Sequence, residues 1–192
     1  DAAGADIEWR TAQDYPREAL KGLAHAADLI VVSPRGALGD SWTADPADVV
    51  MGSGRPVLLV PEGRNHLRGK AVVFAWKDSR EARRALTDSL PFLQRAEDVM
   101  VTVVHGPDET VEEQQLADVV ANLKRHGVRA RALVTSARPD DVPDELQKVA
   151  KLNQADLIVA GAYGHSRLRE WAFGGVTRAF MHHPECFVLF SH

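Results

Sequence analysis

The chain has 192 residues, of which 45% are apolar and 26% charged, and its formal net charge is −4. This composition is ordinary for a globular protein, and the negative charge argues against nucleic-acid binding, which needs a basic face. The single cysteine, Cys186, permits no internal disulfide and has no metal-type Cys/His spacing around it, so a reduced, cytoplasmic setting is expected. No apolar run approaches the ~20 residues of a membrane-spanning helix, so no membrane partner is expected.

Six short apolar segments predict buried strands. They are continuous rather than alternating, which is typical of parallel strands covered by helices on both faces. In chain order they are residues 28–33, 56–61, 71–76, 99–104, 155–160 and 187–190.

The segments between these strands have helical spacing. After Ser79, four apolar residues fall on one helix face, and two further segments repeat the pattern. A basic last turn followed by Gly127 predicts the end of the second of these helices. The face residues are Ala82, Leu86, Leu90 and Leu93, then Leu116, Val120 and Leu123, then Val142, Leu146 and Val149. Alternating strands and helices predict the α/β class, built from βαβ units.

The chain also repeats itself. Asp28-Leu-Ile-Val-Val matches Asp156-Leu-Ile-Val-Ala at an offset of 128, and both Gly36/Gly164 and Pro56/Pro184 keep that offset. The unchanged offset predicts no net insertion between the copies, and residues 5–11 take the place of the strand at 128–133. We therefore expect a complete second domain at 70–192, a linker at 64–69, and at 1–63 only the C-terminal part of a first domain. Two strands and two helices of that first domain are expected to precede Asp1.

A glycine-rich stretch follows the strand at 155–160. Gly161 and Gly164 let the backbone approach a ligand closely, and Gly174 and Gly175 open the next helix, where uncovered N–H groups favour an anion. Loops at the carboxyl ends of parallel strands meet where ligands bind in open sheets. The loop Ala75-Trp76-Lys77-Asp78, after the first strand of the second copy, is expected at the same place.

These residues bear a family resemblance. Gly161-x2-Gly164-x9-Gly174 resembles the nucleotide loop of universal stress proteins, G-x2-G-x9-G-(S/T), and the opening at 75–82 is similar to the family's A-V-D-G-S-E-E-A. The resemblance implies a Rossmann-like, open five-stranded parallel sheet of order 3-2-1-4-5, with helices on both faces. It also implies antiparallel pairing of the last strands of two such domains, here 56–61 with 186–190, giving a pseudo-dimer within the chain and the option of a homodimer. Some members of the family bind ATP and others do not.

The chain departs from the ATP-binding pattern at two positions. Gly175 stands where the family has a hydroxyl residue, and Lys77 stands where it has aspartate, with Asp78 one place later. The missing hydroxyl removes one phosphate hydrogen bond, about 0.5–1.5 kcal/mol, although Thr177 lies nearby in sequence. The expected nucleotide-binding residues are Ala75, Trp76, Lys77, Asp78, Gly161, Gly164, Gly174, Gly175, Val176 and Thr177.

Three functions remain open at this level. The first is a stress-response module that binds ATP, as its magnesium complex, or a related nucleotide; the second is an interaction scaffold that binds no nucleotide. The third, an enzyme such as a slow ATPase, is disfavoured because no catalytic triad, H-E-x-x-H or Cys-x-x-Cys motif is present. In the first half, Pro46 and Ala47 replace the last two glycines, and proline offers no N–H to a phosphate, so that half is expected to be structural. Gly52–Gly54 and Gly63–Gly69 are expected to be turns.

Overall fold

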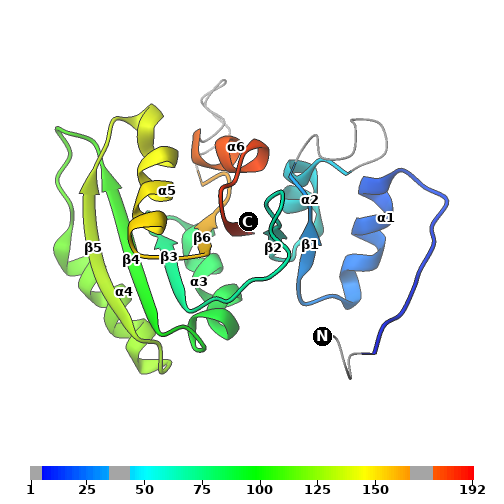
Figure 1. Cartoon of the computed structure of the whole chain (residues 1–192), viewed down its shortest axis with the longest axis horizontal. Coiled ribbons are helices and arrows are strands. Elements are labelled where there is room, and N and C mark those ends of the chain that lie inside the picture. The colour runs from blue at the N-terminus through cyan, green and yellow to red at the C-terminus, as the bar shows by residue number, and fades with distance from the viewer. Residues whose placement is uncertain (1–5, 35–43, 165–174) are drawn as a thin grey trace.

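The described residues form one sheet of seven strands (Figure 1). The computed structural model describes residues 6–34, 44–164 and 175–192. The strands are β1 (Ile30–Val32), β2 (Val57–Leu59), β3 (Ala71–Ala75), β4 (Asp98–His105), β5 (Ala130–Ser136), β6 (Leu157–Gly161) and β7 (Phe187–Ser191). The helices are α1 (Pro16–Leu23), α2 (Pro46–Ser53), α3 (Arg80–Leu93), α4 (Glu113–Arg125), α5 (Val142–Leu152) and α6 (Gly175–His182).

The strand order is β1-β2-β7-β6-β3-β4-β5. Within the second half this gives β5-β4-β3-β6-β7, all parallel, which is the predicted order 3-2-1-4-5. β2 pairs antiparallel with β7, with Val57 opposite Phe190 and Leu59 opposite Val188. The α/β fold is therefore confirmed, but the sheet has seven strands rather than five, because this pair joins the strands of both halves.

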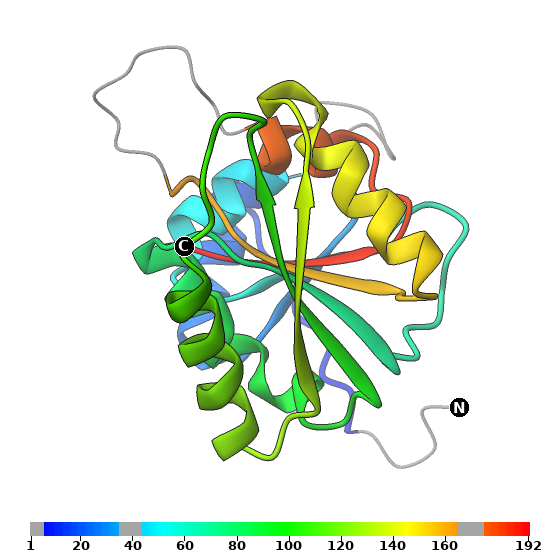
Figure 2. The ribbon, with the colours of Figure 1, turned by 90° about the vertical axis from the view of Figure 1, so that its left-hand side faces the viewer.

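Helices cover both faces of the sheet, which explains the unbroken apolar strands. Seen from the side in Figure 2, α3 and α4 lie on one face and α5 and α6 on the other. The face under α3 and α4 buries Phe74, Leu93 and Leu123. The opposite face buries Val73 and Phe180 together with α2 of the first half, so one core continues across both halves. No helix among the described residues is long and apolar enough to cross a membrane.

The expected strand at residues 5–11 was wrong. Residues 6–12 have no regular secondary structure, and Ile7 and Trp9 are 75% and 87% exposed. Its counterpart in the second half, β5, is held only by β4. Residues 6–34 and 44–63, the part of the first half that the structure describes, contain no strand equivalent to β4, so the backbone groups of residues 6–12 have no ladder partner there.

The expectation of no net insertion between the copies was also wrong. Ile30 pairs with Val57, whereas Ile158 pairs with Val188, which lies three residues further along its copy. The two matched prolines, Pro56 and Pro184, therefore do not occupy equivalent places in the sheet. The extra residues lengthen the connection that leads into β7.

Helix ends follow local chemistry. The Ser79 hydroxyl accepts a hydrogen bond from the Ala82 N–H at 3.1 Å and begins α3. Gly127 takes the left-handed conformation, φ 77°, just beyond α4, as its sequence predicted. Gly54 does the same after α2, with φ 65°, so the fragment Gly52–Gly54 is a helix terminus and turn.

Candidate functional site

Two of the predicted loops lie side by side at the carboxyl edge of the sheet. Ala75 pairs with Ala160, so Trp76 follows β3 beside Gly161 at the end of β6. Gly161 in turn pairs with Ser191 of β7. The loop at 75–78 and the segment 161–164 therefore leave neighbouring parallel strands, which is where open α/β sheets bind ligands.

The first two glycines of the predicted loop pack against the first turn of α3. A Cβ atom on Gly161 would lie 2.5 Å from the Ala82 nitrogen and 2.6 Å from the Glu81 carbonyl carbon. On Gly164 it would lie 3.0 Å from both Glu81 Oε2 and Ser79 Oγ. Close helix packing thus accounts for both glycines, whether or not a ligand is bound.

Glu81 is a buried carboxylate beside this glycine pair. It is only 4% exposed, and the Arg80 guanidinium donates to Oε1 at 2.5 Å. Burial by itself would raise the pKa of the Glu81 carboxyl, but hydrogen bonds from Arg80, its own backbone N–H and the Ser79 hydroxyl outweigh burial and hold the pKa below its usual value. A negative charge therefore sits at the N-terminus of α3, where it compensates the helix dipole.

The loop after β3 is largely occupied by internal contacts. The Trp76 ring packs on the core under α3 and α4, with its centroid 6.1 Å from that of Phe74. The backbone N–H of Trp76 donates to the Thr102 carbonyl at 2.8 Å. Asp78 forms an ion pair with Arg83. Ala75 is the half-buried last residue of β3, and Lys77 follows Trp76 in the same loop.

Tyr163 lies at this edge, close to the start of α2 in the first half, a position that the sequence did not indicate. It has a left-handed backbone, φ 59°, which is uncommon outside glycine. Its half-buried ring meets His192 edge-on at 6.4 Å, and His192 Nδ1 lies 3.0 Å from the Ala162 carbonyl oxygen. Burial raises the pKa of the Tyr163 hydroxyl, and Asp45 and Asp48 at the start of α2 raise it further.

α6 begins with Gly175, and Val176 and Thr177 lie in its first turn. The first N–H groups of a helix have no intrahelical acceptor, so this terminus can donate to an anion. Val176 packs on the core and Thr177 is 3% exposed. The third predicted glycine, Gly174, lies outside the described residues.

The start of α2, which corresponds in the first half to the start of α6, has a different N-terminus. Pro46 is the first residue of α2, and the Asp45 carboxylate accepts a hydrogen bond from the Ala47 N–H at 3.0 Å. A side-chain carboxylate thus caps this helix. Among residues 6–34, 44–164 and 175–192, no group of three His, Cys, Asp or Glu side chains could hold a metal ion.

Comparisons with known proteins place the second half in a family. A family model described as the universal stress protein family matches residues 69–192. No curated protein sequence matches the chain.

Solved structures show the same fold. A universal stress protein from Archaeoglobus fulgidus has a TM-score of 0.67 at 16% identity, over 92% of this chain and 64% of that one, so this chain spans less than two thirds of that protein's length. The universal stress protein UspA from Lactobacillus plantarum has a TM-score of 0.54 at 16% identity, over 66% of this chain and all of that one. A universal stress protein in complex with cAMP has a TM-score of 0.51 at 20% identity, over 64% of this chain and 96% of that one.

Proposed function

Because the chain belongs to the universal stress protein family, we propose that it is a stress-response module that binds ATP or a related nucleotide at the glycine loop of its second half. The observation that carries this proposal is the strand register. Ala75 opposite Ala160 brings the loop at 75–78 beside the segment 161–164. α6, whose uncovered N–H groups would meet the phosphates, follows the same loop in the chain.

Two groups of the expected residues would contact the nucleotide, while Gly161 and Gly164 would let the loop pack closely against α3. Backbone N–H groups at Gly174, Gly175, Val176 and Thr177 would bind the phosphates, with Mg²⁺ carried in by the nucleotide. Residues Ala75–Asp78 would contact the base or sugar. The cAMP complex of one structural neighbour is consistent with a nucleotide of this kind, and binding rather than catalysis is the proposed activity, in the cytoplasm, where Cys186 stays reduced.

A second candidate function, a scaffold that binds no nucleotide, is favoured by one specific observation. Glu81 Oε2 lies 3.0 Å from the Cβ position of Gly164, so a charged carboxylate stands beside the start of the glycine loop, where it would repel a phosphate. The glycine pair is also explained by packing against α3. In this second function the pairing of β2 with β7, and a homodimer formed by two chains, would supply the interaction surface.

Thermal unfolding with and without Mg-ATP separates the two candidates. Ligand at about 100 times its dissociation constant adds about 2.7 kcal/mol of stability, which for a chain of this size raises Tm by about 5–10 °C. Gly174→Asp places a negative charge in the proposed seat and should abolish the shift. Gln13→Asp, an added charge in the exposed segment before α1, is the matched control and should retain it.

No shift at millimolar ATP or cAMP in the folded wild-type protein would reject the nucleotide proposal in favour of the scaffold. Light scattering on the same samples tests the homodimer, and phosphate release tests the expected lack of turnover.

A further inference from the structure

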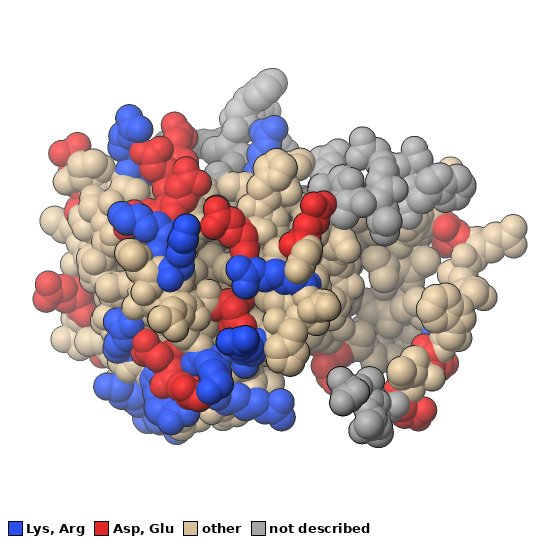
Figure 3. Space-filling model, in the orientation of Figure 1, with Lys and Arg blue, Asp and Glu red and all other residues tan. Residues whose placement is uncertain are grey.

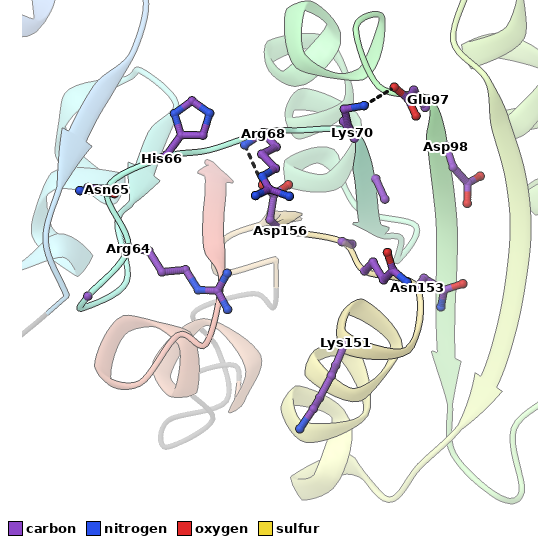
Figure 4. Close-up of a pocket in the computed structure, with 14 residues that line it drawn as sticks. Arg64, Asn65, His66, Arg68, Lys70, Glu97, Asp98, Lys151, Asn153 and Asp156 are labelled. Atoms are coloured by element: carbon purple, nitrogen blue, oxygen red, sulfur yellow. Dashed lines mark hydrogen bonds and ion pairs between the residues drawn. The ribbon is translucent and has the colours of Figure 1, made fainter. Parts of the chain in front are cut away.

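A cavity of about 730 Å³ lies at the opposite edge of the sheet, where the strands begin. Its walls are the connection between the two halves, the first residues of β3 and β4, and the turn from α5 into β6 (Figure 4). Its size is within the range of small-molecule sites in proteins. It shares no lining residue with the carboxyl-edge site, so the inference drawn from it is independent of the proposed function.

The acidic side chains of this cavity are all engaged. Asp156 accepts hydrogen bonds from the backbone N–H groups of Arg68 and Gly69, at 2.7 and 3.0 Å. Glu97 pairs with Lys70 at 2.9 Å, and Asp98 pairs with Arg131, outside the cavity, at 2.9 Å. Lys70 and Arg131 thus neutralise Glu97 and Asp98, whereas Asp156 keeps its negative charge because its partners are neutral backbone N–H groups.

Three cationic side chains of the cavity remain. Within the described part of the chain, Arg64, Arg68 and Lys151 form no ion pair with a carboxylate within 4.0 Å. Arg64 extends from the connection toward the space beside α5, and α5 carries Lys151 (Figure 4). Lys and Arg side chains also gather where β3, β4 and β5 begin, at the lower left of Figure 3, with acidic side chains among them.

The three unpaired side chains Arg64, Arg68 and Lys151 are positive, whereas the whole protein has a formal net charge of −4. These three cations, drawn from two separate segments, outnumber the one carboxylate of the cavity that has no cationic partner, Asp156, so the excess positive charge favours an added anion. Guanidinium groups match phosphate oxygens with two parallel hydrogen bonds, whereas lysine acts as a point charge.

We infer that this cavity is a binding site for a small anion carrying two or more phosphoryl groups, held by Arg64, Arg68 and Lys151. Such a ligand joins the connecting segment to α5. Binding therefore fixes the segment that links the two halves, while the carboxyl edge stays free for another ligand.

Isothermal titration with pyrophosphate, and separately with ATP, tests the site on the full chain. Pyrophosphate should bind the wild-type protein at micromolar to submillimolar concentration, and Arg64→Ala with Lys151→Ala should weaken binding at least tenfold. All these side chains are exposed, so the variant should keep its fold, which circular dichroism verifies. The control, Arg17→Ala with Arg138→Ala, removes two cations elsewhere, and Gly174→Asp alters only the carboxyl edge; both should bind pyrophosphate as the wild type does.

Trypsin gives a second measurement. It cleaves after Arg64 and Arg68, which lie in the exposed connection, and pyrophosphate should slow these cleavages severalfold in the wild type but not in Arg64→Ala with Lys151→Ala, where Arg68 remains cleavable. Absence of pyrophosphate binding at 5 mM, equal binding by that variant, or an equal loss in the Arg17/Arg138 control would overturn the inference. ATP binding that survives Gly174→Asp but is lost with Arg64 and Lys151 would support this cavity and count against the glycine loop.

Discussion

Gly161→Ala should destabilise the protein through a single added methyl group. The new Cβ would lie 2.5 Å from the Ala82 nitrogen and 2.6 Å from the Glu81 carbonyl carbon, which are backbone atoms of α3. No side-chain rotation relieves these contacts, so α3 must move off β6. Overpacking of this kind costs about 1–3 kcal/mol, and each kcal/mol lowers Tm by about 2–4 °C in a chain of this size.

Two matched alanine variants make the measurement specific. At Gly164 the same methyl meets side-chain atoms of Glu81 and Ser79 at 3.0 Å, which can adjust, so about half the effect or less is expected. At Gly22, in α1, nothing lies within 4 Å, and alanine favours a helix by up to about 1 kcal/mol. Thermal unfolding followed by circular dichroism should therefore give the lowest Tm for Gly161→Ala, a higher Tm for Gly164→Ala and the highest for Gly22→Ala. A Gly161→Ala protein that melts within 1 °C of the wild type would refute this account of α3 packing.

Three further outcomes are expected. The pKa of the Glu81 carboxyl lies below its usual 4.5, so the ionised carboxylate stabilises the fold above pH 4.5, and this stability is lost on acidification. Urea unfolding should therefore show that Glu81→Gln has a lower free energy of unfolding than the wild type at pH 6, with the difference shrinking toward pH 3. A difference that stays constant with pH would contradict this. Burial raises the pKa of the Cys186 thiol to about 12, so a thiol reagent at pH 8 should label the native protein far more slowly than the urea-unfolded protein, and equal rates would show that Cys186 is not buried. Asp156→Ala leaves the N–H groups of Arg68 and Gly69 without their acceptor; it should cost about 1–2 kcal/mol and speed tryptic cleavage of the connection, and unchanged cleavage would show that Asp156 does not hold it.

Much of the fold could be predicted from local pattern. The continuous apolar strands, the cap at Ser79 and the glycine after α4 are each determined by nearby residues, and each appears in the structure. The pairing of β2 with β7 followed from the family resemblance, because antiparallel pairing between halves leaves no local mark on either strand.

The errors have a non-local cause. Residues 6–12 have strand-like composition, yet a strand exists only where a neighbour supplies hydrogen bonds. The equivalence of Pro56 and Pro184 came from matching letters, whereas strand register counts the residues in the preceding connection.

The site was predictable only in its outline. Glycine spacing indicated close approach of backbone, and the structure shows Gly161 and Gly164 close to α3. The buried Glu81 and the contact of Tyr163 with His192 depend on segments about 80 and 30 residues apart in the chain, so neither could be predicted from one stretch of sequence.

The central claim, nucleotide binding at the carboxyl edge, is tested most directly by an NMR titration of the ¹⁵N-labelled protein with Mg-ATP. The account predicts saturable shifts of the amides at 75–78, 161–164 and 175–177, while those at 63–70 and 151–156 stay in place. Saturating nucleotide that moves no amide at the carboxyl edge, or only those around the cavity at the opposite edge, would contradict it.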